Sequence, residues 1–353
     1  RAHAREVQRL AKISGDVYRE TRDLYNEAFS LQLLGDYREC IALTMRGRTA
    51  LRLCGLSHGQ VDFGLMGIQA EVHKLKSEYV DAHNIQGQIF QEATNDNYQQ
   101  AFSLMNIAEI EVMMGVSKAE IQKKIDTSQA TLKTTQGVIA GDATQADLNL
   151  REGDMSTTLF RKCLQLGWGT YPEAVGYCLE RLAHIDRWEG FHSTLWPTVY
   201  LAHSLKVKEK LGIYKGLQFV GDVRLGGQDE VTATSLFTLA LEGFTQMDVH
   251  RSRAECMIRL GDISNKRGDS LEALALWEQA RPQFERSSQV KRIQDIDERL
   301  VGIDGDIKEQ HKLHNRNLDR LAELKAPVGM VEELDKDLSE DGLENEEAQL
   351  VTV

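Results

Sequence analysis

The sequence predicts an all-α fold, an α-solenoid of about seven helix–turn–helix repeats. Three observations favour this fold class. A small residue returns along the chain at a nearly constant spacing, a turn follows it at a constant distance, and only four prolines occur in 353 residues. Because a proline inside a helix removes a backbone hydrogen bond, so few prolines permit long helices throughout the chain.

The clearest copy of the repeat is SRAECMIRLGDISNKRGDSLEALALWEQA, residues 252–280. Its first helix carries apolar residues at helical spacing around Gly261, which permits a second helix to approach closely. Gly268-Asp269 ends this helix, since glycine suits a left-handed C-terminal cap. The second helix places small alanines around Trp277. Such a pair cannot bury its apolar face alone, so it needs neighbouring pairs.

Seven copies align on this small residue, with successive spacings of 42, 38, 38, 37, 38 and 40 residues. The small residues are Ala28, Ala70, Ala108, Ala146, Ala183, Gly221 and Gly261. Seven residues later comes the turn between the two helices, written Gly35-Asp36, Ser77-Glu78, Gly115-Val116, Gly153-Asp154, Gln228-Asp229 and Gly268-Asp269. A period this steady indicates one helical unit stacked along the chain.

These residues resemble the tetratricopeptide repeat (TPR) family over roughly residues 20–300. The best copy matches the family pattern at Leu260, Gly261, Gly268, Asp269, Ala273 and Ala280. The resemblance implies a right-handed superhelix whose first helices line a concave groove. The period of about 38–42 residues exceeds the usual 34, so we expect longer helices. Such long repeats resemble the arrays of signalling scaffolds and of STAND-type NTPase regulators.

We divide the chain into four parts. Residues 1–14 are interpreted as the remnant helix of a truncated unit, 15–300 as the solenoid, 301–326 as a C-terminal capping helix and 327–353 as a disordered acidic tail. From Ala326 onward there are nine acids and one lysine, which carry −8 of the formal charge of −12. Like charges and few aromatic residues favour disorder there. Because the chain opens with Arg1 rather than Met, we expect it to be the C-terminal part of a larger protein.

Composition argues against several classes of function. The nearly neutral body lacks the excess of Lys and Arg that nucleic-acid binding requires. There is no run of about 18 apolar residues and no signal peptide, so we expect an intracellular, cytoplasmic protein without membrane contact. The five cysteines are scattered without a CxxC pair, so we interpret all of them as reduced packing residues.

The sequence motifs indicate neither an enzyme nor a site for a cofactor or a metal ion. Gly55-Leu56-Ser57-His58-Gly59 spells the GxSxG of hydrolases, but a helix precedes it where a strand is needed, so we expect Gly55 to cap that helix. His311 and His314 share a helix face without an evident third ligand, so we expect both on the surface. The sequence contains no phosphate-binding GxxxxGK[ST] and no HExxH.

Copy five differs from the others in its turn region. Trp196-Pro197 predicts a helix start at the proline, with the second helix over Thr198–Leu211. The residues Phe191, His192, Trp196 and Tyr200 either pack a longer inter-helix loop or line a ligand pocket.

The residue after each small one forms a column that the TPR resemblance directs toward the concave groove. Its members are Phe29, Glu71, Glu109, Asp147, His184, Asp222 and Asp262. If its five acids face solvent, they favour a peptide rich in Lys or Arg. Alternatively, they keep the groove solvated or bond neighbouring helices. The groove lacks the repeated Lys/Asn set of the TPR clamps that hold chaperone C-termini.

The sequence therefore predicts a non-catalytic scaffold that binds a peptide or protein segment, with basic character expected of the partner. The alternative is a ligand-sensing array of a STAND-type NTPase whose nucleotide-binding domain is not in this chain.

Overall fold

The computed structural model describes residues 15–188, 193–303 and 305–325, and all regular elements in these ranges are α-helices. The chain divides after Val301 into two compact units. The second unit contains α17 (Gly305–Lys325). The first contains α2 (Val17–Leu33), α3 (Tyr37–Leu53), α4 (Gln60–Lys76), α5 (Tyr79–Glu92), α6 (Asn97–Met114), α7 (Lys118–Thr131), α8 (Thr135–Arg151), α9 (Thr158–Gly167), α10 (Pro172–Trp188), α11 (Leu195–Val207), α12 (Lys210–Gly226), α13 (Glu230–Gln246), α14 (His250–Lys266), α15 (Ser270–Arg286) and α16 (Val290–Val301).

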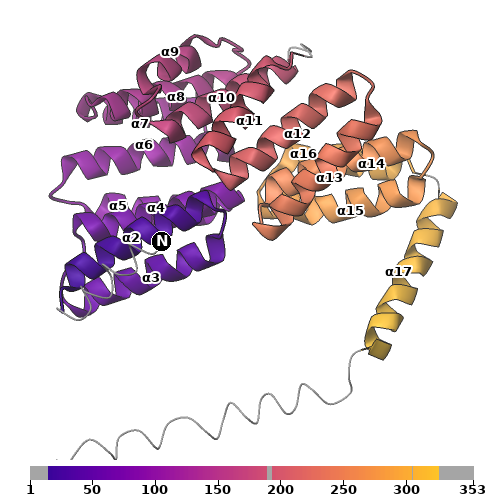
Figure 1. Cartoon of the computed structure of the whole chain (residues 1–353), viewed down its shortest axis with the longest axis horizontal. Helices are drawn as coiled ribbons and strands as arrows, with labels where there is room; N and C mark the ends of the chain where they lie inside the picture. Colours follow the sequence, from indigo (N-terminus) through magenta and orange to yellow (C-terminus); the bar gives the residue numbers. More distant parts are fainter. Residues whose placement is uncertain (1–14, 189–192, 304, 326–353) are drawn as a thin grey trace, which may run out of the picture. The chain divides into compact units, whose positions relative to one another are not determined.

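Helices α2 to α15 form seven consecutive pairs, and α16 follows the seventh (Figure 1). Each of the seven aligned small residues lies in the first helix of a pair, so the all-α solenoid is confirmed. The helices α2, α3 and α4 each have 17 residues. Two helices of this length and two short turns fill the observed period.

The turn has a left-handed residue in six of the aligned pairs, all those whose turn the structure describes. Gly35, Gly115, Gly153 and Gly268 have φ values between +74° and +93°, and Ser77 and Gln228 take the same region in their copies. In copies six and seven the following acid caps the second helix, because the Asp229 and Asp269 carboxylates accept backbone N–H groups of Thr232 and Glu272 at 3.1 Å.

The small residues are buried, and the two glycines among them each face a large ring of the paired helix. A Cβ built at Gly221 would lie 2.7 Å from Phe237, and one at Gly261 would lie 2.6 Å from the indole nitrogen of Trp277. Both distances are too short for real atoms. These copies therefore need glycine because their second helix supplies an aromatic ring.

The first helices of successive pairs pack against one another. Contacts join α2 to α4, α6 to α8, α8 to α10 and α10 to α12. The first helices thus form one layer, whose surface away from the second helices we call the inner face.

The first unit also makes a contact between its early and late pairs, which we call the closure contact. One apolar cluster contains Leu24, Tyr37 and Cys40 together with Phe244 and Met247. A Cβ built at Gly35, in the turn before α3, would lie 2.5 Å from the sulfur of Met247. The curvature of the stack therefore brings copy one against copies six and seven (Figure 1).

The structure corrects several expectations about single elements. The second helix of copy five is α11, Leu195–Val207, rather than Thr198–Leu211, because Lys208 takes a left-handed conformation that ends it early. Gly55 follows α3 with a φ of +68°, as expected for a cap. Cys54 is exposed, so it is not a packing residue, whereas the other four cysteines are buried. His311 is buried and contacts Asn315, whereas His314 is exposed as expected.

The remnant helix expected at residues 1–14 and the acidic tail expected at 327–353 lie outside the described residues. The capping role of residues 301–326 stays a prediction, with α17 covering 305–325 of that range. Among the described helices, none is both long and apolar enough to cross a membrane.

Candidate functional site

The column that follows the small residues lies on the first helices. Within it, three carboxylates form ion pairs at one repeated register. Asp147 and Asp222 each bind the arginine two positions before the next small residue, and Asp262 binds Arg299 of α16, which follows the last pair. The pairs are Asp147–Arg181, Asp222–Arg259 and Asp262–Arg299, spanning α8–α10, α12–α14 and α14–α16. In Asp262–Arg299 both guanidinium contacts are short, 2.8 and 3.0 Å, which is the bidentate geometry of a strong pair.

The same register continues where the acid is absent. His184 replaces the acid in copy five, and Phe219 stands at the corresponding position of α12. Their rings meet edge to face with centroids 4.7 Å apart. An aromatic pair thus takes the place of an ion pair, and we call the whole series the inter-repeat ladder.

Two acids of the column share a lysine instead. Lys74 lies 2.8 Å from Glu71 on its own helix α4 and 2.9 Å from Glu109 on α6. Burial opposes the charge of this ammonium, but Glu109 and Glu71 outweigh it and raise the pKa of Lys74. The ammonium therefore stays charged and holds α4 to α6.

The predicted binding residues of the column differ in how far their side chains are exposed to solvent. The Asp147 side chain is only 3% exposed, so of the two alternatives the one in which it faces solvent is wrong, whereas Asp262 is 41% and Glu71 36% exposed. Burial raises the pKa of Asp147, and Arg181 and Tyr177 offset this only partly. These contacts favour the alternative interpretation, in which the acids bond neighbouring helices.

Two further ion pairs join neighbouring helices of the first unit. Glu180 on α10 accepts from Lys215 on α12 at 3.0 Å through both carboxylate oxygens. Burial disfavours its ionisation, but Lys215, Arg181 and His184 lower the pKa of Glu180 to about 2. Glu255 on α14 likewise binds Arg292 on α16 at 2.7 Å. The inner face is therefore charged but internally paired.

The aromatic residues of copy five are separated by the structure. Phe191 and His192 lie outside the described residues. Trp196 is half-buried, with the Arg161 guanidinium 5.9 Å from its ring centre. Tyr200 is buried against Phe219 and donates to Glu180 at 3.4 Å. Both described residues belong to the core, which favours the loop-packing alternative, and the pocket stays a prediction.

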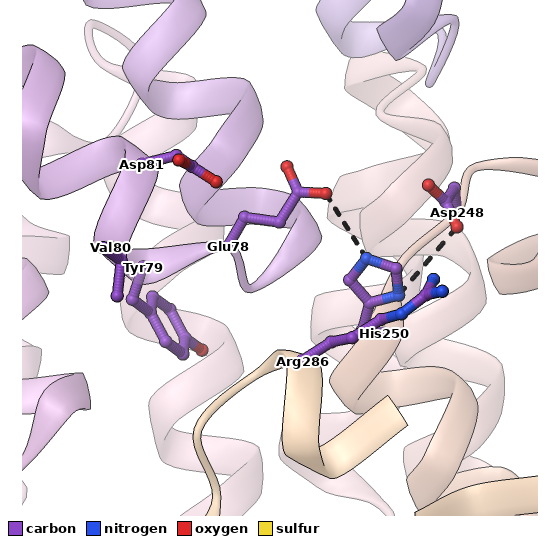
Figure 2. Close-up of a pocket in the computed structure, with 7 residues that line it drawn as sticks. All are labelled: Glu78, Tyr79, Val80, Asp81, Asp248, His250 and Arg286. Carbon is purple, nitrogen blue, oxygen red and sulfur yellow. Dashed lines mark hydrogen bonds and ion pairs between the residues drawn. The ribbon is translucent and has the colours of Figure 1, made fainter. Parts of the chain in front are cut away.

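A cavity of about 310 Å³ lies instead where early and late repeats meet (Figure 2). Its lining comes from the start of α5, the turn before α14 and the end of α15. The lining residues are Glu78, Tyr79, Val80, Asp81, Asp248, His250 and Arg286. Figure 2 shows the Glu78 side chain extending toward His250, which lies beside Asp248.

Glu78 is the centre of this site. One carboxylate oxygen lies 3.3 Å from Nε2 of the buried His250 and 2.7 Å from the Lys76 ammonium, and the other lies 2.7 Å from Nδ1 of His73. Burial opposes ionisation, but these hydrogen bonds outweigh it and hold the pKa of Glu78 well below its usual range. Lys76 also pairs with Asp248 at 3.0 Å. We call these residues the closure latch.

The latch contains donor sets that could hold a metal ion. Glu78, Asp248 and His250 form one set, and His73, Glu78 and Asp81 form another. The Lys76 ammonium, however, contacts the carboxylates of both Glu78 and Asp248, so it supplies the positive charge that a metal would bring. The first set therefore fits an internal ion-pair network better than a metal centre.

Sequence reasoning found the ladder acids but not their partners, and it missed the latch. The arginines had little sequence signal, because only Arg181 and Arg259 stand two positions before an aligned small residue, and the other five copies carry a different residue there. The latch had no comparable signal, since 172 residues separate Glu78 from His250.

No protein-family model and no curated protein matches this sequence. Among solved structures, one similar chain is a Rap protein complexed with competence and sporulation factor. The two chains are 9% identical with a TM-score of 0.49, and the match covers 83% of this chain and 98% of the other.

Proposed function

We propose that this chain is a non-catalytic scaffold that binds a peptide or an extended protein segment along its inner face. The inter-repeat ladder is the observation that supports this most. Its ion pairs fix polar side chains of successive first helices in register along one surface. An ordered polar surface shared by many repeats suits an extended partner that contacts one repeat after another.

The expected preference for a basic partner stays a prediction. Most acids of the column are already neutralised by a neighbouring base, which weakens their attraction for a further cation. Glu71 and Asp262 keep more than a third of their side chains exposed. We propose that lysines or arginines of the partner bind at these two residues, because their side chains are the more exposed ones.

Site-specific crosslinking tests the binding surface. The full chain is used to select a ligand from a displayed library of random peptides, and a photo-crosslinking residue is then placed at His184 or Asp262 on first helices. Matched control positions are Met45 and Leu239, which are exposed on the second helices α3 and α13. We expect crosslinks to the selected peptide at the inner positions only. Crosslinks confined to Met45 and Leu239 would place the binding surface outside and overturn the proposal.

Charge is tested separately with Glu71→Gln and Asp262→Asn. For a basic peptide we expect several-fold weaker binding and a flatter dependence on salt, because exposed charges are screened within about 8 Å at physiological ionic strength. Asp126→Asn on α7 is the matched control, since this acid is exposed on a second helix. Equal affinities of the parent chain and all three variants would contradict the preference for a basic partner. They would not contradict the proposed binding surface.

The alternative function, a ligand-sensing array of an NTPase, stays a prediction that none of the described residues tests.

A further inference from the structure

Two cysteines that lie apart in the sequence meet in the structure. Cys163 is on α9 and Cys178 is on α10, and these consecutive helices pack against each other. Both side chains are buried, at 1% and 0% exposure, in one apolar cluster that also contains Phe160 and Leu182. The Cys163 thiol donates to the backbone carbonyl of Ile139 at 3.6 Å, and the neighbouring Cys178 thiol is close enough to shift its pKa.

We propose that Cys163 and Cys178 form a site of reversible oxidation, at which a peroxide converts the two thiols into a disulfide. The thiolate of Cys163 attacks the O–O bond, and hydroxide leaves with the bonding pair and takes up a proton as water. The Cys178 sulfur then attacks the sulfenic acid of Cys163, forms the S–S bond and releases a second water. The two thiols lose two electrons and two protons in total, and the peroxide is reduced to two waters.

The nearness of the two sulfurs also favours one of them as the first to react. Interaction with the Cys178 thiol lowers the pKa of the Cys163 thiol, although burial and Asp142 oppose this. The same contact raises the pKa of Cys178. Cys163 is therefore the attacking thiol and Cys178 the resolving one, a division of roles that suits peroxide chemistry.

The burial of both sulfurs limits the size of the oxidant that can reach them. With both sulfurs closed off from solvent, a bulky disulfide such as oxidised glutathione cannot reach them, whereas hydrogen peroxide is close to water in size. The resulting bond would lie next to Tyr177, whose hydroxyl donates to Asp147 in the ladder. Oxidation would thus fix α9 to α10 beside the rung that joins copies four and five.

Peptide mapping tests the site. The full chain carrying Cys54→Ser, which removes the exposed thiol, is treated with hydrogen peroxide in urea concentrations that increase but stay below unfolding. Remaining thiols are alkylated, and the chain is digested without reductant. We expect a crosslinked peptide joining residues 163 and 178, lighter than the sum of its parts by two hydrogen atoms and lost on treatment with dithiothreitol. The melting temperature should rise on oxidation and return on reduction.

The controls separate this pair from general thiol oxidation. Cys163→Ser and Cys178→Ser should abolish the crosslinked peptide, and Cys256→Ser should retain it, because Cys256 is buried in a different cluster. Circular dichroism checks that each variant folds. Recovery of Cys163 and Cys178 as separately alkylated thiols, or as sulfinic acids, at every urea concentration would overturn the proposal.

Discussion

Nε2 of His250 lies 3.3 Å from the Glu78 carboxylate, although 172 residues separate them, so this contact joins the second repeat to the seventh. We expect this bond and its neighbours in the latch to stabilise the closed form of the first unit. Glu78→Gln should lower the free energy of unfolding by about 1–3 kcal/mol, because Lys76 and the histidines lose a charged acceptor. Chemical denaturation measures this, with Asp81→Asn in the same cavity as the control. Equal effects of the two substitutions would contradict a special role for Glu78.

The same residue predicts a loss of stability in acid. Its pKa lies far below the ordinary value of 4.5 in the folded chain, so the unfolded chain binds more protons as the pH falls through and below that value. The stabilisation is therefore present above about pH 4.5 and is lost at lower pH. Thermal melts between pH 6 and pH 3 should show a steeper decline for the parent chain than for Glu78→Gln. Parallel curves would show that this carboxylate does not carry the pH dependence.

Glu209 predicts the opposite trend at higher pH. Burial, with repulsion from Glu180, Glu71 and Glu173, raises its pKa to about 7 despite the attraction of Lys215. Between about pH 4.5 and pH 7 the folded chain holds the extra proton, so stability falls as pH rises through this window. Glu209→Gln removes the titration.

We therefore expect Glu209→Gln to melt at a higher temperature than the parent chain at pH 8 and at nearly the same temperature at pH 4.5. A constant difference between the two chains at all pH values would instead indicate a simple packing effect.

The ladder predicts that one substitution has different costs at two equivalent positions. Asp147→Asn leaves the buried Arg181 with only its longer contact to Glu180, 3.4 Å, and should cost about 3–5 kcal/mol. Asp262→Asn affects a pair whose acid is 41% exposed and should cost at most about 1 kcal/mol. Urea unfolding of both variants measures the contrast. Similar costs would mean that burial does not set the strength of these pairs.

Gly261 is required by the size of Trp277. Gly261→Leu should lower the free energy of unfolding by about 1–3 kcal/mol or more, because the Cβ alone would approach the indole to 2.6 Å. Gly67→Ala is the matched control, since this glycine also lies inside a first helix but has open space around it. There we expect a gain of roughly 0.5–1 kcal/mol from reduced backbone entropy. A Gly261→Leu variant as stable as the parent would refute the alignment of this copy.

The sequence by itself determined the repeat and its parts. The small residue, the turn seven positions later and the caps were all predicted, because each depends on contacts between residues close together in one helix pair. The requirement for glycine at positions 221 and 261 can also be recognised in the sequence, since Phe237 and Trp277 stand at the same number of residues after Gly221 and Gly261. The acid column was also located correctly on the first helices.

Only the tertiary structure decided what these residues contact. The sequence left open whether Asp147 faces solvent or bonds a neighbouring helix, and packing of successive first helices places it against Arg181 and buries it. Cys163 meets Cys178 because α9 and α10 pack face to face, which no cysteine spacing indicates. The closure contact and the latch depend on the small rotation between neighbouring pairs, summed over several repeats. A sequence pattern encodes the period of a solenoid but not that summed angle, so the meeting of Glu78 with His250 could only be found in three dimensions.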